Sequence, residues 1–266
     1  MHNITQRMER PFNWVMDRVY ASLPQPVPEL KRLRSCKIIS HRGECDNQHV
    51  FENTIPAFDS VADAGAWGLE FDVRWTKDLQ PVISHDRDGR RLYGSPLTIN
   101  QITLATLKAE LPLIPTLEEI IVRYGGKLHL MIELKQENIL HPERQAQILQ
   151  DLLAPLRPGE DFHILSLHPH MFELADFVAP STFLAVSTMN TKQLSELTLR
   201  RDYAGIAGHY AFLKDALLAR HQRRGQKVGT GFIHSQNCLF REINRGVDWI
   251  FTNHAVKIQS IRNAHL

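Results

Sequence analysis

The feature that most constrains the fold is a repeated alternation of short apolar runs with helix-like stretches. Eight runs rich in β-branched residues span 37–40, 68–73, 128–134, 162–167, 183–187, 203–207, 227–232 and 248–252. Between them, apolar residues recur at steps of three and four, which is the period of an amphipathic helix. The alternation predicts an α/β fold, a TIM (β/α)₈ barrel, whose functional groups gather at the C-terminal strand ends. An open doubly wound sheet is disfavoured because no Gly-rich phosphate loop opens the first helix.

The chain is expected to divide into an N-terminal extension, 1–36, and a single barrel domain, 37–266. Apolar residues at helical spacing predict a helix near the start, and they are Phe12, Val15, Met16, Val19 and Leu23. Three prolines within 23–28 cannot continue that helix, so they predict a linker. The mixed charges of the helix favour a cap on one barrel end over a membrane anchor.

Composition limits the partners and the compartment. A formal net charge of +2 is too small to imply a nucleic-acid partner. The sequence has no run of about 18 apolar residues and no signal-peptide core at its start, which predicts no transmembrane segment. Its three cysteines, irregularly spaced, match no zinc motif and favour a reducing compartment. These observations predict a cytoplasmic protein.

A ninth apolar run, 81–85, breaks the alternation. Only residues 74–80 separate it from the second strand, whereas a parallel crossover needs a dozen or more residues. The run must therefore turn back as a hairpin with 77–78 at its turn. This geometry is expected to return His85 beside Asp72.

Acidic side chains are expected to meet at one mouth of the barrel. Alternation along 68–73 puts Glu70 and Asp72 on one face, and Glu133 and Lys135 share a face of the third strand. Buried carboxylates would repel one another unless a cation lay between them. Oxygen-only ligation favours one divalent cation, Mg²⁺ or Ca²⁺, which would act as a Lewis acid on a phosphoryl oxygen.

Two histidines end at the same rim, His41 after the first strand and His85 after the hairpin. One histidine can deprotonate an attacking hydroxyl while the other protonates a departing alkoxide. Arg42 and Lys135 supply positive charge for a phosphodiester anion. A single histidine at a strand end is usually structural. Five polar groups at the tops of the first strands have no such explanation, because barrel interiors are otherwise apolar.

Several ordered motifs together resemble the glycerophosphodiester phosphodiesterase family, of the phospholipase-C-like barrel type. They are HRG at 41–43, ENT at 52–54, GLEFDVRWTKDLQPVISHD at 68–86, IPTLEE at 114–119 and IELK at 132–135. The match extends from about residue 37 to 256, and its specificity comes from the combination.

The resemblance implies hydrolysis of a glycerophosphodiester to sn-glycerol 3-phosphate and an alcohol. It implies that His41 and His85 are the general acid and base, that Glu70, Asp72 and Glu133 bind the metal, and that Arg42 and Lys135 contact the phosphate. In this family type, a glycerol hydroxyl attacks its own phosphorus and water then opens the cyclic product. Asn53 is assigned as a helix cap or a supporting residue.

The sequence also departs from the family pattern. Phe51 replaces a proline, and Leu79 replaces a glycine, which argues against a tight positive-φ turn at that point. The stretch 231–234 and Asn253 differ from the usual Trp-Thr-Val-Asn and Thr-Asp, which leaves the substrate wall open to question. A short 87–112 segment predicts a comparatively open site.

Other functions compete with this interpretation. Lysophospholipase D-like activity on lysophospholipids is the main alternative, and sphingomyelinase D-like chemistry is a related one. A barrel amidohydrolase would need a histidine pair on the first strand, where only His41 stands. A catalytically silent binding protein on the same fold is the alternative from a different class.

Overall fold

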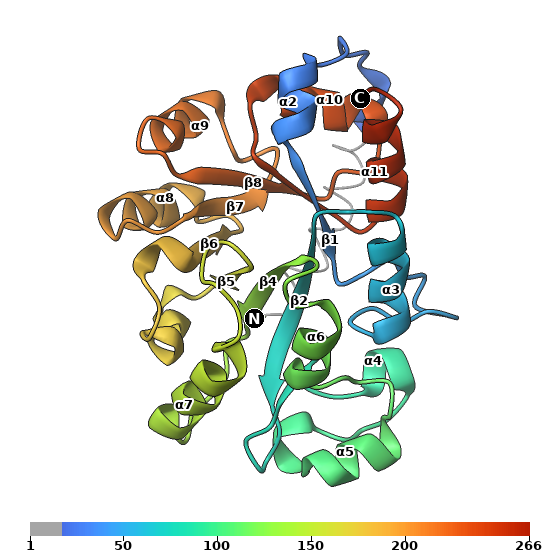
Figure 1. Ribbon diagram of the computed structural model, residues 1–266, viewed down its shortest axis with the longest axis vertical. Coiled ribbons are helices and arrows are strands. Elements are labelled where there is room, and N and C mark those ends of the chain that lie inside the picture. The colour runs from blue at the N-terminus through green and yellow to red at the C-terminus, as the bar shows by residue number, and fades with distance from the viewer. Residues whose placement is uncertain (1–17) are drawn as a thin grey trace.

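The computed structural model describes residues 18–266, and its strands form a closed barrel (Figure 1). The eight parallel strands are β1 (Lys37–His41), β2 (Gly68–Trp75), β4 (His129–Leu134), β5 (Phe162–Ser166), β6 (Phe183–Ser187), β7 (Gly205–His209), β8 (Lys227–Gly231) and β9 (Trp249–Thr252). The ring closes because β1 pairs with both β2 and β9. The predicted TIM barrel is confirmed, although β7 begins two residues later than expected. Tyr203, before β7, packs against the rings of Phe172 and Phe183 instead.

Helices surround the strands (Figure 1). They are α2 (Leu30–Ser35), α3 (Ile55–Asp63), α6 (Leu117–Tyr124), α7 (Pro142–Leu153), α8 (Thr191–Arg200), α9 (Asp215–Gln222), α10 (Gln236–Arg245) and α11 (Ala255–Asn263), with the 3₁₀ turns η2 (Pro169–Ala175) and η3 (Pro180–Thr182) between β5 and β6. Local chemistry fixes some of their starts. Thr116 and Glu119 form a reciprocal capping box at α6, and the Ser235 hydroxyl accepts a hydrogen bond from the Cys238 N–H at the start of α10.

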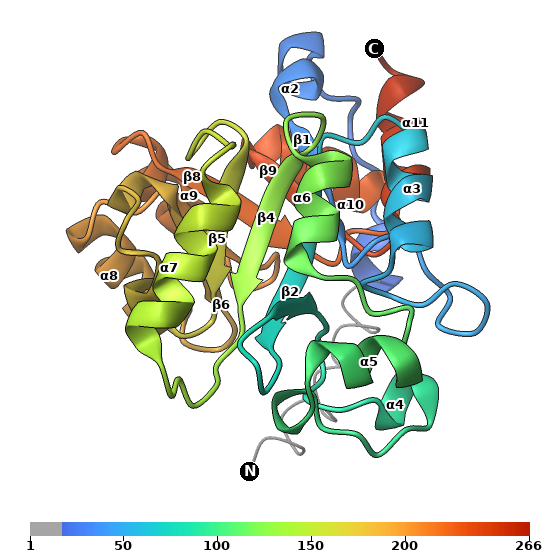
Figure 2. The same cartoon turned by 60° about the horizontal axis from the view of Figure 1, so that its bottom comes forward.

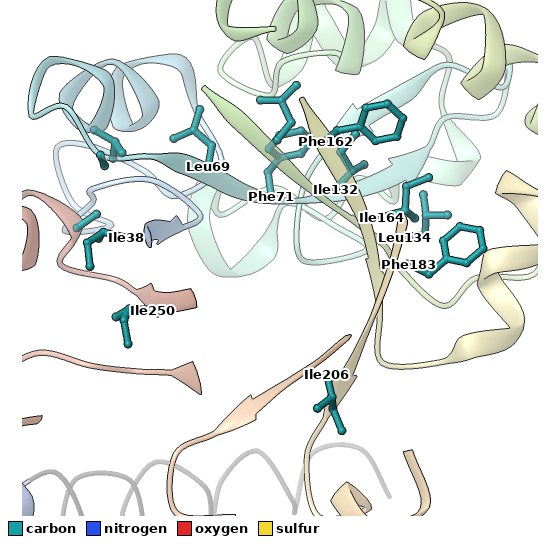
Figure 3. Close-up of a cluster of buried hydrophobic side chains, with 14 of the residues drawn as sticks. Ile38, Leu69, Phe71, Ile132, Leu134, Phe162, Ile164, Phe183, Ile206 and Ile250 are labelled. Atoms are coloured by element: carbon teal, nitrogen blue, oxygen red, sulfur yellow. The ribbon is translucent and has the colours of Figure 1, made fainter. Parts of the chain in front are cut away.

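Side chains on the strands alternate between two apolar layers. The outer layer packs under the helices and includes Leu69, Phe71, Ile132, Leu134 and Ile164 (Figure 3). The inner layer fills the barrel and includes Ile39, Met131, Leu165, Leu184 and Phe251. Because Leu69 and Phe71 face outward, Glu70 and Asp72 face the barrel interior, as the alternation predicts. Gly229 leaves room for this packing, since a Cβ there would lie 2.7 Å from the Phe251 ring.

The ninth run forms the predicted hairpin. Strand β3 (Pro81–Ile83) pairs antiparallel with β2, so that Val73 lies opposite Ile83. The expectation about its turn was wrong, because Leu79 adopts φ +58°. The Thr76 carbonyl accepts a hydrogen bond from the Leu79 N–H at 3.0 Å, and Thr76 Oγ1 accepts one from Gln80 at 2.9 Å. These bonds, with packing of Leu79 on the core, offset the strain of a left-handed leucine.

Between β3 and α6 the chain makes a small excursion, which contains α4 (Arg90–Tyr93), η1 (Ile99–Gln101) and α5 (Leu104–Glu110). Figures 1 and 2 both show α4 and α5 at one end of the molecule, apart from the ring of helices. A separate apolar cluster anchors the excursion, and Val82 of β3 belongs to it together with Ile99, Leu107, Leu111 and Ile114.

Part of the expected N-terminal helix lies outside the described residues, including Phe12, Val15 and Met16. Residues 18–22 are helical, and 24–29 have no regular structure, as the prolines predict. Helix α2 follows and packs on the barrel through Leu33, which is buried and whose carbonyl accepts a hydrogen bond from Arg262 at 2.7 Å. Within 18–266, none of the helices combines the length and apolar character that crossing a bilayer requires.

Candidate active site

Three acidic side chains meet at the C-terminal ends of β2 and β4. Glu70, Asp72 and Glu133 each offer one oxygen within 4.8 Å of the others, and all three residues are buried. Strand register produces this meeting, because Asp72 lies directly opposite Glu133 across the β2–β4 pair. His41 lies opposite Glu70 across the β1–β2 pair. The sequence-predicted carboxylates therefore come together, while their role as ligands stays a prediction.

Two cations balance part of this negative charge. Arg42 Nε lies 3.1 Å from Asp72 Oδ2, and Lys135 Nζ lies 3.1 Å from Asp72 Oδ1 and 2.8 Å from Glu133 Oε1. The contacts to Asp72 are at ion-pair distance without hydrogen-bond alignment. Burial alone would raise the pKa of Asp72, but Arg42 and Lys135 hold it well below its usual range. Asp72 is therefore ionised.

Glu70 is left with the unbalanced charge. Burial, followed by the neighbouring Asp72 and Glu133, raises the pKa of Glu70 well above its usual value. In the described part of the chain, its buried Oε2 has no hydrogen-bond partner. A carboxylate in this position needs either a proton or a cation. An oxygen-only ligand set with one unsatisfied buried oxygen fits a hard divalent cation.

His41 is oriented by a residue from the far end of the chain. Its Nδ1 lies 2.6 Å from Asn253 Oδ1, and because an amide oxygen only accepts, Nδ1 carries the proton. The other nitrogen, Nε2, lies 3.8 Å from Glu70 Oε2. Burial, together with the nearby Arg42, lowers the pKa of His41 to about 3. This lowered pKa favours a neutral imidazole.

His85 is held on both its ring and its backbone. Its Nδ1 lies 2.8 Å from Asp86 Oδ1. Its carbonyl accepts two hydrogen bonds from Arg74, from Nε at 2.9 Å and from Nη2 at 2.5 Å. The preceding Ser84 donates its N–H to the Asp72 carbonyl at 2.9 Å, so the hairpin returns beside Asp72 as predicted.

Supporting residues around these groups were missed or left open by sequence reasoning. The sequence left two roles open for Asn53, a helix cap or a supporting residue. The structure agrees with the second, since Asn53 Nδ2 donates to Asp72 Oδ2 at 2.8 Å while Thr54 occupies the N-cap position. Glu52 accepts a hydrogen bond from Arg42 Nη1 at 3.1 Å. Arg42 and Asn53 both have left-handed backbones, with φ +63° and +59°. Such strain commonly gathers at functional sites.

The 231–234 stretch, which the sequence left open as a substrate wall, places an aromatic side chain beside His41. Phe232, directly after β8, has φ +70° and is 40% exposed. Its ring meets His41 edge to face at 5.8 Å between centroids, and it lies at the same distance from His209. Phe232 therefore forms part of the wall beside a candidate catalytic histidine.

A buried cluster of three carboxylates at the mouth of a (β/α)₈ barrel, with His41 beside it and the hairpin returning His85 to the same rim, is an arrangement suited to phosphodiester cleavage. Comparison with known proteins agrees, because residues 41–257 match the model of the glycerophosphoryl diester phosphodiesterase family. The chain belongs to this family, and it is a phosphoric diester hydrolase. The amidohydrolase and silent-binder alternatives are thereby not supported. Members of the family are generally dependent on a divalent metal.

Individual relatives cover most of the chain. A glycerophosphodiester phosphodiesterase of Caldanaerobacter subterraneus is 28% identical over 231 residues, which are 81% of this chain and 93% of the relative. A Thermotoga maritima glycerophosphodiester phosphodiesterase superposes with TM-score 0.72 at 22% identity, covering 85% and 98% of the two chains. An Oleispira antarctica phosphodiesterase, solved with the product sn-glycerol-3-phosphate, has TM-score 0.72 at 24% identity, with 85% and 96% covered. The two solved structures support the fold.

Proposed function

We propose that the protein hydrolyses glycerophosphodiesters to sn-glycerol 3-phosphate and an alcohol by metal-dependent, two-histidine catalysis. The observation that carries the proposal is the meeting of His41 with the buried cluster of Glu70, Asp72 and Glu133 at the rim to which the hairpin returns His85. Members of the family hydrolyse glycerophosphodiesters, so the proposal concerns the products, the cofactor and the residue roles.

Charge complementarity supports a phosphate site beside the carboxylates. Glu70, Asp72 and Glu133 would hold one divalent cation, Mg²⁺ or Ca²⁺, which when bound supplies Lewis-acid charge at a phosphoryl oxygen. Arg42 and Lys135 would bind the phosphodiester oxygens, Arg42 through its planar fork and Lys135 as a point charge. Glu52 and Asn53 keep Arg42 and Asp72 in register, through the hydrogen bonds to Arg42 and Asp72.

The partners of the two histidines suggest how the roles divide. A neutral amide, Asn253, faces His41, and this favours a free base at Nε2. A carboxylate, Asp86, contacts His85 at Nδ1, and this orients the ring so that Nε2 can deliver a proton. His41 would take the proton of the glycerol hydroxyl as its oxygen forms a bond to phosphorus. His85 would give a proton to the alcohol oxygen as the opposite P–O bond breaks.

The second half of the reaction reverses these roles. Water attacks the cyclic phosphodiester, His85 accepts its proton, and protonated His41 returns a proton to the glycerol oxygen as the ring opens. Both histidines end in their starting states, and the net consumption is one water molecule per diester.

Phosphorus NMR of a substrate panel tests the proposal. Glycerophosphocholine and glycerophosphoethanolamine should each give sn-glycerol 3-phosphate in the presence of Mg²⁺ or Ca²⁺, with EDTA abolishing the product signal. Lysophosphatidylcholine tests the lysophospholipase D alternative, for which the exposed Phe232 offers an apolar contact. Turnover of lysophospholipid alone, or turnover that survives EDTA, would contradict the proposal. The cytoplasmic location also stays a prediction.

A further inference from the structure

Arg91, on helix α4 of the excursion, joins two acidic side chains that belong to different parts of the rim. Its Nε lies 2.5 Å from Asp86 Oδ2. Its two terminal nitrogens reach Glu52, with Nη2 2.7 Å from Oε1 and Nη1 3.1 Å from Oε2. The guanidinium therefore donates to two carboxylates at once. Asp86 lies five residues before Arg91 in the sequence, and Glu52 lies 39 residues before it.

Each of these acids holds a side chain of the proposed chemistry. Asp86 uses its other oxygen, Oδ1, to contact His85 Nδ1 at 2.8 Å. Glu52 accepts from Arg42 Nη1 at 3.1 Å. Arg91 thus links two pairs of contacts into one series, in which the order of residues is His85, Asp86, Arg91, Glu52 and Arg42.

The surroundings keep this series ionised and in place. Burial would raise the pKa of Glu52, but hydrogen bonds and charge from Arg91 and Arg42 lower it to about 2. Helix α4 is held near Glu52 because the ring of Tyr93 packs on Phe51 at 5.3 Å between centroids. Phe51 therefore anchors the helix that carries Arg91.

We propose that Arg91 is a positioning residue for the reaction, which orients the acid His85 through Asp86 and fixes it relative to the phosphate-binding Arg42 through Glu52. This inference rests on the proposed function. Without Arg91, Asp86 and Glu52 would lose the cation that lies between them, and Asp86 could rotate away from His85. A lysine could not replace it fully, since one ammonium cannot span both carboxylates in a fixed geometry.

The test compares Arg91→Ala with Arg90→Ala, its neighbour on α4. Arg90 is the matched control because its side chain is 66% exposed and pairs with Asp88 at the surface. Two substrates separate positioning of the acid from a general structural effect. Glycerophosphocholine releases a strongly basic alkoxide, which needs protonation, whereas the 4-nitrophenyl ester of glycerol 3-phosphate releases a stable phenolate that does not.

Arg91→Ala should lower kcat for glycerophosphocholine about 10- to 100-fold, as misplacement of a catalytic group does. For the nitrophenyl ester, the single-turnover rate of nitrophenolate release should fall less than about 3-fold, since this first step does not need protonation of the leaving group. Arg90→Ala should leave both rates unchanged, and Arg91→Lys should recover only part of the loss. Asp86→Asn should reproduce the leaving-group dependence, and adding Arg91→Ala to it should cost little more.

Equal losses on both esters, or wild-type rates in Arg91→Ala, would overturn the inference. Thermal unfolding of each variant identifies any loss of fold, and Arg91→Gln then replaces the alanine variant. His85→Ala separates this outcome from failure of the proposed function. If His85→Ala is inactive on glycerophosphocholine while Arg91→Ala is normal, only the role of Arg91 is refuted. If the wild-type protein hydrolyses neither ester, the proposed function itself fails.

Discussion

Replacing Glu70 by glutamine should separate two effects of the acidic cluster, the electrostatic destabilisation of the metal-free fold and the binding of a metal ion. In the metal-free protein, Glu70 faces Asp72 and Glu133 with ligand oxygens within 4.8 Å. At an effective dielectric constant of about 20, each like-charge pair at that distance repels by about 3.5 kcal/mol. Lys135 and Arg42 offset much of this. A net cost of about 1–3 kcal/mol remains whenever Glu70 is ionised without a cation.

The sign of the pH dependence follows from the raised pKa of Glu70. A carboxyl group with a folded-state pKa above its unfolded value binds more protons when folded. Its stabilising contribution is present below the unfolded pKa and is lost as pH rises through the raised folded pKa. In EDTA, wild-type stability should therefore fall relative to Glu70→Gln with rising pH, by about 2–10 °C in Tm for a chain of this size.

Differential scanning fluorimetry between pH 5 and pH 9, with EDTA and then with added Mg²⁺ or Ca²⁺, measures both effects. Added metal should raise the Tm of the wild type and not that of Glu70→Gln, so their order should reverse. The exposed Glu196 on α8 supplies the control, because Glu196→Gln should follow the wild type throughout. If Glu70→Gln and wild type change in parallel with pH in EDTA, or if both respond equally to metal, the reasoning about the cluster is refuted.

Three further predictions address the other parts of the molecule. His85→Ala should lower kcat for glycerophosphocholine about 10²–10⁴-fold but affect single-turnover release of nitrophenolate from the nitrophenyl ester much less, whereas His41→Ala should impair the first step with both esters alike; a reversed pattern would exchange their roles. Asn253→Asp should raise the pKa of His41 by placing an anion on its Nδ1, moving the acidic limb of kcat/KM up by about one pH unit, and an unmoved limb would remove Asn253 from this role. Phe71→Ala should lower the free energy of unfolding by about 3–5 kcal/mol in urea titrations, and a loss below about 1 kcal/mol would contradict its place in the outer core.

Periodicity explains why much of the site could be predicted from the sequence. Alternation fixes which face of a strand a side chain occupies, and parallel strands bring their C-terminal ends to one rim. Glu70, Asp72 and Glu133 could therefore be placed together without a structure. The hairpin followed from chain length, because seven residues cannot make a parallel crossover.

Turn conformations held by particular hydrogen bonds, and contacts between distant segments, could not be predicted in this way. The turn at Leu79 was misjudged because its positive φ is stabilised by hydrogen bonds to Thr76, which a rule about glycine does not consider. Asn253 was noted only as a departure from a pattern, since nothing local indicates that it bonds to His41. Arg91 lies in a segment without strong periodicity, so its two carboxylate partners emerged only from the fold.

Closure of the ring has a consequence for how activity arises during synthesis. His41 and Asn253 are separated by 212 positions, yet their hydrogen bond exists only because the last strand docks on the first. A growing polypeptide on the ribosome would already contain every proposed metal ligand and both imidazoles long before β9 emerges. Catalytic activity should therefore appear only after β9 has docked on β1. Fragments that end before residue 249 should be inactive even when most of their secondary structure has formed.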